Sequence, residues 1–293
     1  MPRVPYVGVN DKAKKVKKMY IGIDDKARKV LKAYVGVNGI AHIFFTADWW
    51  IPYGLKEENC LAAYQFYHAK DHGAAITDIT GHGHNIWDYR YCTWNYDSGY
   101  YITSGTDSSG LKASNNFGTS VVTAVFWYTG LPMASDSTLD GGRWLSCHGT
   151  GQNMAAGRIG DISYSNNGEW KIDKSIKNYP GFCFSYKPYE SWNDSDGYLR
   201  LYRGNSQLPS SGVVAFDRSY PQIYVNGNAI GVSYYNNGKV ETINNMPATS
   251  SNGNVTIGGG TRPNTYIRAA GFFNCRLTAR QHSDLAKALA EVK

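Results

Sequence analysis

An Asn-Gly dipeptide between two short apolar runs, at Asn226 and Gly227, is the feature that most restricts how this chain can fold. Both residue types readily adopt the positive φ angles of a tight two-residue turn. Flanked by apolar runs, the pair is the strongest short-range signal for a β-hairpin that a sequence offers. We therefore predict a hairpin over residues 222–232, and with it an antiparallel sheet.

The chain after this hairpin carries two further strand signals and one helix signal. Residues 255–260 read Val-Thr-Ile followed by three glycines, which is typical of a strand that runs into a tight turn. Residues 266–273 are rich in Ile, Ala and aromatic side chains, which favour strands. Thr278 and Gln281 have the spacing of a capping box. The residues behind them form one apolar stripe, namely Leu285, Ala286, Leu289 and Val292. We therefore predict a single C-terminal helix in an otherwise β chain.

Apolar and aromatic runs also recur through the middle of the chain, separated by clusters of Gly, Asn and Ser. This spacing is typical of an all-β sandwich. The runs that we interpret as strands are residues 61–67, 121–128, 144–147, 159–164, 182–186 and 198–202.

The N-terminal segment repeats itself with a period of 14 residues. Its copies read Tyr-Val-Gly-Val-Asn or Tyr-Ile-Gly-Ile-Asp and begin at Tyr6, Tyr20 and Tyr34. A fixed period implies one structural unit repeated. Turn-forming residues share one phase in every copy, at positions 10–11, 24–25 and 38–39. The stretches of about ten residues between turns suit strands, so residues 1–46 are predicted to form a small β-meander.

A helical alternative stays open for residues 12–20 and 26–34, because Lys and Ala favour helices locally. Alternation supports strands, since Met19, Ile21 and Ile23 would fall on one face of a strand.

The excess positive charge of the chain lies in this repeat segment. Residues 1–45 contain ten Lys and Arg against three Asp, a balance of +7, and the remaining 20 basic and 20 acidic residues cancel. Regularly spaced basic side chains suit an acidic protein partner as well as a nucleic acid. We favour acidic partner subunits, because the nucleic-acid interpretation rests on charge alone.

The chain has no apolar run long enough to span a membrane, and its first residues lack the apolar core of a signal peptide. We therefore expect synthesis in a cytoplasm without export by the usual route. The five cysteines are odd in number and widely spaced, so we interpret them as free and mostly buried thiols.

The order of elements after position 220 carries a resemblance. An Asn-Gly hairpin, a Thr-Ile-Gly-Gly element, an Ile-Arg-Ala-Ala-Gly-Phe-Phe-Asn strand and a short helix resemble the end of a concanavalin A-like (laminin-G-like) jelly-roll domain. Residues 63–66 and 76–81 are similar to the opening strands of that family. The resemblance covers residues 61–293. It implies an all-β fold, a concanavalin A-like jelly-roll β-sandwich with a short C-terminal helix, preceded by the N-terminal β-meander.

The repeats carry a second resemblance. Tandem Tyr-Val-Gly-Val-Asn-x-x-Ala units resemble the N-terminal repeats of tail-associated structural proteins of bacteriophages and prophage-derived particles. This implies that residues 1–46 anchor the chain to other tail or baseplate subunits and that residues 47–60 act as a linker. It also implies a location in a virion or tail-like particle. Because unpaired strand edges invite pairing with another chain, we expect a homo-oligomer.

Jelly-roll domains that bind sugars use loops or a sheet face lined with aromatic rings. The ligand-binding candidates are therefore aromatic residues of two long polar stretches, namely Tyr189, Trp192, Tyr234 and Tyr235. The loop 189–197 also contains Asp194 and Asp196, which match part of a calcium-loop pattern. The alternative is that this loop is simply a polar turn. No other cofactor is indicated, and the expected partner is a host-surface glycan or protein.

The sequence does not indicate catalysis. Glucanases of this fold carry paired carboxylates on one strand, and no Glu-x-Asp-x-Glu or similar pair occurs here. We therefore expect a non-enzymatic structural and receptor-binding component. A glycan-processing enzyme of the same fold stays open as the alternative, because carboxylates distant in sequence can converge in the fold.

Two further groups of residues have competing interpretations. A zinc site is one interpretation of four histidines, His68, His72, His82 and His84, but no third-ligand spacing accompanies them. The aromatic residues of segment 44–55 suit packing at a junction better than ligand binding.

Overall fold

The computed structural model describes most of the chain. The described residues are 6–9, 12–15, 19–23, 26–30, 32–37, 40–46, 48–52, 54–90, 92–102, 110–115, 117–130, 143–149, 152–159, 161–164, 170–173, 179–185, 199–219, 221–236, 254–258 and 265–292. Contacts divide the chain into two compact units, Met1–Lys56 and Glu57–Lys293.

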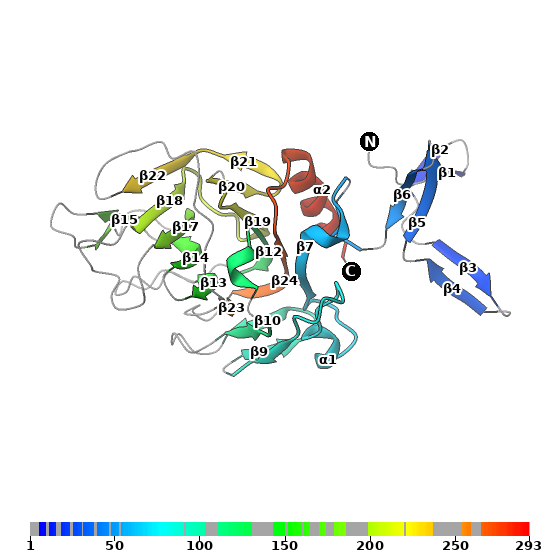
Figure 1. Ribbon diagram of the computed structural model, residues 1–293, viewed down its shortest axis with the longest axis horizontal. Helices are drawn as coiled ribbons and strands as arrows, with labels where there is room; N and C mark the ends of the chain where they lie inside the picture. The colour runs from blue at the N-terminus through cyan, green and yellow to red at the C-terminus, as the bar shows by residue number, and fades with distance from the viewer. Residues whose placement is uncertain are drawn as a thin grey trace. The chain divides into compact units, whose positions relative to one another are not determined.

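The N-terminal unit contains three antiparallel hairpins, one for each repeat (Figure 1). Their strands are β1 (Tyr6–Val9), β2 (Lys12–Lys15), β3 (Met19–Ile23), β4 (Lys26–Val30), β5 (Lys32–Val37) and β6 (Ile40–Thr46). The same cross-strand pair of small residues recurs in every hairpin, as Gly8 with Ala13, Gly22 with Ala27 and Gly36 with Ala41. The 14-residue period is therefore the period of one hairpin.

The paired strands flank the positions where the sequence predicts turns, but the strand pairing differs from a continuous meander. Within the described part of the repeats, each strand pairs with its neighbour in the same repeat, and no pairing joins one repeat to the next. The stretch between the first two predicted turns, which suits a single strand, instead contains β2 and β3, two strands of different hairpins. Pairing between strands that are only two residues apart in the sequence closes the shortest loop and so loses the least chain entropy. The helical alternative is wrong, because Lys12–Lys15 and Lys26–Val30 are strands.

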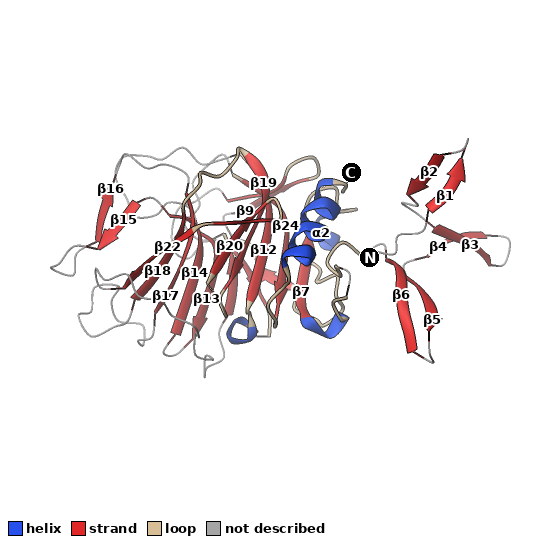
Figure 2. Cartoon of the chain, turned by 90° about the horizontal axis from the view of Figure 1, so that it is seen from above, coloured by secondary structure: helices blue, strands red, loops and turns tan. Residues whose placement is uncertain are grey.

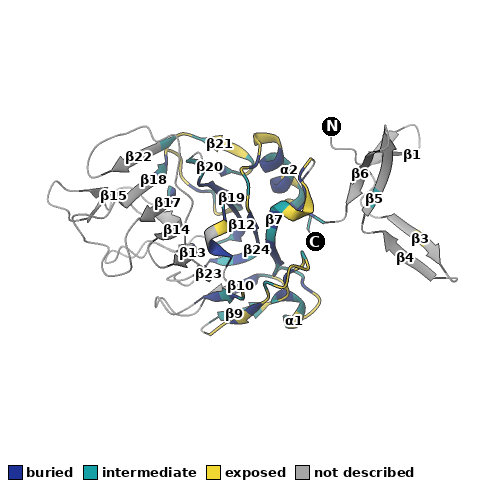
Figure 3. Ribbon diagram, in the orientation of Figure 1, coloured by how far each residue is buried: buried dark blue, intermediate teal, exposed yellow. Residues whose placement is uncertain are grey.

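The larger unit contains two eight-stranded antiparallel sheets. The first follows the order β21-β20-β19-β12-β24-β10-β9, and β7 also pairs with β24. Its strands are β7 (Cys60–Gln65), β9 (Cys92–Asn95), β10 (Gly99–Ile102), β12 (Thr123–Thr129), β19 (Ser211–Asp217), β20 (Gln222–Val225), β21 (Asn228–Ile230) and β24 (Tyr266–Phe273). Its central strands β12 and β24 are among the most buried parts of the unit (Figure 3).

The second sheet follows the order β22-β18-β17-β14-β13-β23-β11-β8. Its strands are β8 (Ile86–Asp88), β11 (Leu111–Ala113), β13 (Arg143–Gly149), β14 (Gln152–Ile159), β17 (Tyr179–Ser185), β18 (Leu199–Gly204), β22 (Val232–Asn236) and β23 (Asn254–Ile257). Figure 2 shows β18, β17, β14 and β13 running side by side. The predicted strand over residues 159–164 is wrong as one element. It comprises the end of β14 and the separate strand β15 (Asp161–Tyr164), which pairs with β16 (Trp170–Asp173). A glycine at position 160 in the sequence favours such an interruption.

The core lies between the two sheets and is mostly aromatic. Phe182 of the second sheet meets Phe216 of the first, with ring centroids 6.1 Å apart. Phe126 and Phe272 meet within the first sheet, edge to face, at 5.8 Å. Such contacts combine apolar burial with favourable ring geometry. The predicted jelly-roll β-sandwich with a C-terminal helix is confirmed.

The hairpin and helix signals are confirmed in detail. Asn226 and Gly227 have φ angles of 50° and 81° and connect β20 to β21. Helix α2 (Ala279–Ala290) begins with the predicted capping box: Thr278 Oγ1 accepts from the Gln281 amide, and the Gln281 side chain accepts from the Thr278 amide. It packs beside β19 and β21 (Figure 1). The remaining short elements are α1 (His72–Ala75) and the 3₁₀ turns Glu57–Asn59 and Gly118–Ser120.

His282 gives helix α2 a pH-dependent contribution to stability. Its ring stacks on Tyr224, with centroids 3.6 Å apart, and is almost fully buried. Burial, and secondly the nearby Arg276 cation, lowers the pKa of His282 from 6.5 to about 3. In the unfolded chain His282 becomes protonated as the pH falls below about 6.5, whereas in the folded chain it stays neutral down to about pH 3. The contribution of neutral His282 to the stability of the folded protein is therefore complete above the pKa of the unfolded chain, and it is lost as the pH falls from that value toward the pKa of the folded chain.

We expect this histidine alone to remove about 2 kcal/mol of stability between about pH 7 and about pH 5. Urea unfolding across this pH range measures the loss. His282→Phe keeps an aromatic ring against Tyr224 but cannot titrate, so its stability should fall less. Identical pH slopes for the two proteins would contradict this role of His282.

Other expectations concern single side chains. Trp49 and Trp50 are buried, 8% and 4% exposed, which supports packing rather than ligand binding by these aromatics.

Cys60, Cys92 and Cys275 are free, but only Cys60 of these is fully buried. Burial raises the pKa of Cys60 and Cys275, and raises that of Cys92 to about 12, so the described thiols are not reactive thiolates at neutral pH. Neither helix of the described chain has the length and apolarity to cross a bilayer.

Candidate functional site

An exposed tryptophan lies on the last strand of the second sheet. Strand β8 pairs with β11 so that Asp88 faces Lys112 and Ile86 faces Ala113, which leaves Trp87 as the extra residue of a β-bulge. A bulge redirects the side chain that it carries. Trp87 is 61% exposed, the highest value among the large apolar side chains of the described residues.

Asp88 holds two cations beside this tryptophan. Its carboxylate is buried and accepts from Arg90 Nε and Nη2, at 3.0 and 2.8 Å, and from Lys112 Nζ at 3.0 Å. The hydrogen bonds from Arg90, and secondly the one from Lys112, hold the pKa of Asp88 well below its usual range despite burial. The carboxylate is therefore ionised at neutral pH. Lys112 Nζ lies 6.0 Å from the centroid of the Trp87 ring, at the limit of a cation–π contact.

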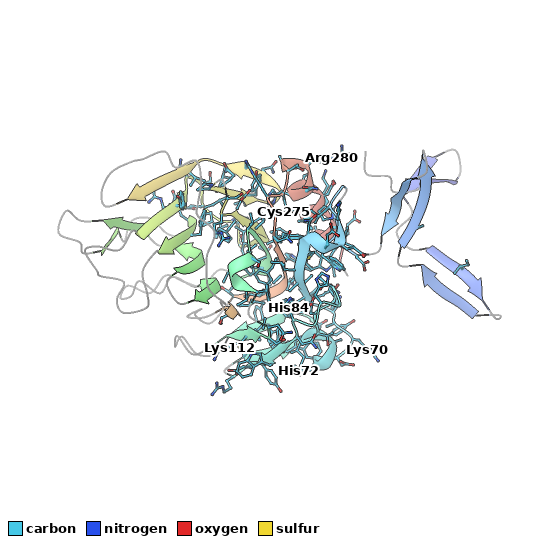
Figure 4. All side chains as sticks on the ribbon, viewed as in Figure 1. Lys70, His72, His84, Lys112, Cys275 and Arg280 are labelled. Carbon is cyan, nitrogen blue, oxygen red and sulfur yellow. The ribbon has the colours of Figure 1, made fainter. Side chains whose placement is uncertain are left out.

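A second exposed ring, Tyr89, rests on a rigid base. It meets His72 edge to face at 4.9 Å, and His72 Nε2 lies 2.8 Å from Tyr100 Oη. Burial raises the pKa of Tyr100, so its hydroxyl stays protonated at neutral pH. Asp71 caps the helix that His72 begins, by accepting from the Ala74 amide at 2.8 Å. Figure 4 places His72 and Lys112 at the end of the domain that carries β9, β10 and α1.

The third exposed ring, Tyr96, ends an aromatic stack on the β9–β10 hairpin. His68 lies between Tyr67 and Tyr96, at centroid distances of 3.8 and 4.6 Å. The His68 amide donates to the Tyr96 carbonyl at 2.9 Å, which fixes an unusual positive φ of 52° at His68. Gly99 has a φ of 90°, and a Cβ there would lie 2.4 Å from the Ile267 carbonyl oxygen. The hairpin can therefore approach β24 closely only because this residue is glycine.

We call these exposed groups the aromatic surface, defined by Trp87, Tyr89, Arg90, Tyr96 and Lys112. The described part of the chain has five exposed large apolar side chains, and the three rings of the aromatic surface are among them. These three rings lie within ten consecutive positions of the sequence. Exposed rings beside fixed hydrogen-bond donors suit ligands that have both an apolar face and polar groups.

The aromatic surface includes none of the residues predicted from the sequence. The ligand candidates Tyr189 and Trp192 and the metal candidates Asp194 and Asp196 fall outside the described residues. Tyr234 and Tyr235 belong to strand β22, where they pair with Tyr202 and Leu201. Strands β22 and β8 are the opposite ends of the same sheet. The structure therefore does not bring Tyr234 and Tyr235 together with the aromatic surface.

The four histidines do not form a metal site. Among the described residues, no group of three or more potential ligands could hold a metal ion. His82 Nδ1 and His84 Nδ1 lie 3.2 Å from the carbonyls of Leu61 and Ser114. These contacts place the two rings in different local networks.

One feature of the sequence could have pointed to the aromatic surface, although it matches no binding motif. Seven aromatic residues fall within fifteen positions, namely Trp87, Tyr89, Tyr91, Trp94, Tyr96, Tyr100 and Tyr101. Such density, with charged residues interleaved, could have identified the segment. It could not have shown which rings are exposed.

Comparisons with known proteins gave structural likeness only. No family model matches the chain, and no curated protein sequence matches it. Among solved structures, the binding domain of botulinum neurotoxin DC is 12% identical with a TM-score of 0.45, over 80% of this chain and 52% of that chain. Domain 4 of AbnA, a GH43 extracellular arabinanase from Geobacillus stearothermophilus in complex with arabinotriose, is 16% identical with a TM-score of 0.37. The likeness covers 78% of this chain and 98% of that domain. Trypanosoma rangeli sialidase is 12% identical with a TM-score of 0.39, over 94% of this chain and 45% of the sialidase. The chain thus spans about half the length of the neurotoxin domain and of the sialidase.

Proposed function

We propose that this protein is a non-enzymatic attachment component of a phage tail or tail-like particle, and that its jelly-roll domain binds a glycan of the host surface. The observation that carries the binding step is the aromatic surface. Sugar rings present apolar faces that stack on aromatic rings, while their hydroxyl groups take hydrogen bonds from fixed polar side chains. Trp87 and Tyr89 offer the rings, and Arg90 and Lys112 offer the donors.

The chemistry of Asp88 favours binding over catalysis at this surface. A glycosidase needs one carboxyl group that is protonated and one that is free to attack or to activate water. The pKa of Asp88 is lowered, so the group is not an acid at neutral pH. Both of its oxygens are hydrogen-bonded to cations, and its side chain is only 5% exposed. Asp88 therefore acts as an anchor for Arg90 and Lys112.

The N-terminal hairpins support the particle-anchoring part of the proposal. Two-stranded hairpins bury little and leave strand edges that another chain can pair with. Their sequence is strongly basic, which suits acidic tail or baseplate subunits. We therefore propose that residues 1–46 anchor the protein to its particle as a homo-oligomer, so that the protein resides in the virion or tail-like particle.

Trp87→Ala tests the binding step in the full-length protein. We expect host-cell binding to weaken by about tenfold, the effect of removing one exposed stacking ring, with an unchanged melting temperature. Ile79→Ala is the matched control, because Ile79 is another exposed apolar side chain of the same domain and lies outside the aromatic surface. Binding to intact cells measures both variants.

Treating the cells separates the two classes of receptor. Periodate oxidation, which cleaves sugar diols, should abolish binding, whereas protease treatment should not. Loss of binding after protease alone would replace the glycan with a protein receptor. Equal binding by wild type and Trp87→Ala would remove the aromatic surface from the proposal.

A further inference from the structure

Lys112 is a positioned cation beside an exposed ring. Its Nζ donates to Asp88 at 3.0 Å and lies 6.0 Å from the Trp87 centroid. Asp88 is the hydrogen-bond acceptor of Lys112 among the described residues, and an ammonium group carries three donors. The Lys112 side chain is 24% exposed, so part of it faces solvent. The cation is thus fixed in place without being fully covered.

The charges around Trp87 do not cancel. Asp88 contributes one negative charge, and Arg90 and Lys112 contribute two positive charges. Arg90 is 71% exposed, whereas Asp88 is only 5% exposed. The buried group is therefore the anion, and the groups that face the solvent are cations. Together these three described residues present a net positive charge to a ligand lying on Trp87.

We propose that Trp87 and Lys112 form a subsite for an anionic sugar, one that carries a carboxylate or a phosphate group. The inference rests on the proposed glycan-binding function and specifies the class of glycan. The sugar ring stacks on Trp87, and its anionic group pairs with the Lys112 ammonium, with Arg90 adding to the field. A neutral sugar would use the ring alone, and a cationic sugar would be repelled.

The arrangement also explains why Asp88 is buried between two cations on a bulge. The bulge turns Trp87 outward while Asp88 keeps its register with Lys112. Since Lys112 comes from the neighbouring strand β11, the cation is held against a sheet rather than on a loop. A side chain fixed in this way loses less conformational entropy when it binds an anion.

Matched pairs of sugars test the subsite on the full-length protein. The pairs are 3′-sialyllactose with lactose, which differ by a carboxylated sugar, and glucose 6-phosphate with glucose, which differ by a phosphate. We expect at least one acidic member to bind about tenfold more tightly than its neutral partner at low salt. This preference should shrink as salt is added, because salt screens exposed charges. Titrations followed by NMR measure both affinities.

Three variants assign the preference to residues. Lys112→Gln keeps a donor for Asp88 but removes the charge, so the acidic preference should disappear while any binding of the neutral sugar stays. Trp87→Ala should weaken both members of a pair. Lys70→Gln removes one exposed positive charge that is not part of the subsite and should change nothing. Melting temperatures confirm that each variant is folded.

The outcomes separate the subsite from the proposed function. Equal affinity for acidic and neutral sugars, or no binding of either acidic sugar, overturns the anionic subsite. Trp87-dependent, periodate-sensitive binding to cells would in that case still support glycan attachment. A preference that survives Lys112→Gln, or that is lost in Lys70→Gln, also overturns the assignment.

Discussion

Gly227→Ala is expected to lower the free energy of unfolding by about 3 kcal/mol or more. Gly227 has a φ of 81°, which an L side chain adopts only with strain. A Cβ at this position would lie 2.6 Å from Ser283 Cα and 3.1 Å from the His282 carbonyl oxygen. These are backbone atoms of helix α2, so the turn and the helix would have to separate. Chemical denaturation of both proteins measures the difference.

Gly81→Ala is the matched control for this prediction. Gly81 has a φ of 83°, but a Cβ at this position would meet no other atom within 4 Å. The same backbone strain without the collision should cost about 1 kcal/mol. The difference between the two variants therefore measures the contact of the Asn226–Gly227 turn with helix α2. Equal losses would show that strain alone accounts for the effect.

Asp78→Ala is expected to cost about 3 kcal/mol, because it removes the centre of the loop that leads into β8. Asp78 is 3% exposed. Its Oδ1 accepts from the Ala63 amide at 3.2 Å and from the Thr80 amide and hydroxyl at 3.1 and 2.7 Å, and its Oδ2 accepts from the His84 amide at 3.2 Å. Alanine would leave these donors without their acceptor.

Two further variants grade this loss in thermal or urea unfolding. Asp78→Asn keeps a side-chain oxygen that can accept from Thr80, but its NH₂ group faces the His84 backbone N–H. This variant should therefore lose less free energy of unfolding than Asp78→Ala. Asp71→Ala removes one exposed helix-capping bond and should lose about 1 kcal/mol. An Asp78→Ala protein no less stable than Asp71→Ala would contradict the role given to this loop.

The features that the sequence predicted well are determined locally. The Asn226–Gly227 turn depends on two residues, and the capping box depends on Thr278 and Gln281, three positions apart. Strand β24 has the predicted bounds, because its Ile, Ala and aromatic run is buried on both sides.

The features that the sequence could not predict depend on partners distant in the chain. Alternation in the repeats does not specify whether a strand pairs within its own repeat or with the next one. Trp87 is exposed because β8 forms a bulge against β11, more than twenty residues later. Asp88 is buried because Lys112 and Arg90 cover it. The contacts of β8 with β11 are not visible in the segment 86–90 alone.

The most direct test of glycan binding by the aromatic surface is to map where a ligand protects the protein. Full-length protein would be exposed to hydroxyl radicals with and without a glycan that binds it on an array, and oxidation would be quantified by mass spectrometry. If the glycan binds to the aromatic surface, Trp87, Tyr89 and Tyr96 will be protected. Protection of Trp192 or Tyr234 instead, with Trp87 unchanged, would contradict it and would place the binding site away from the aromatic surface.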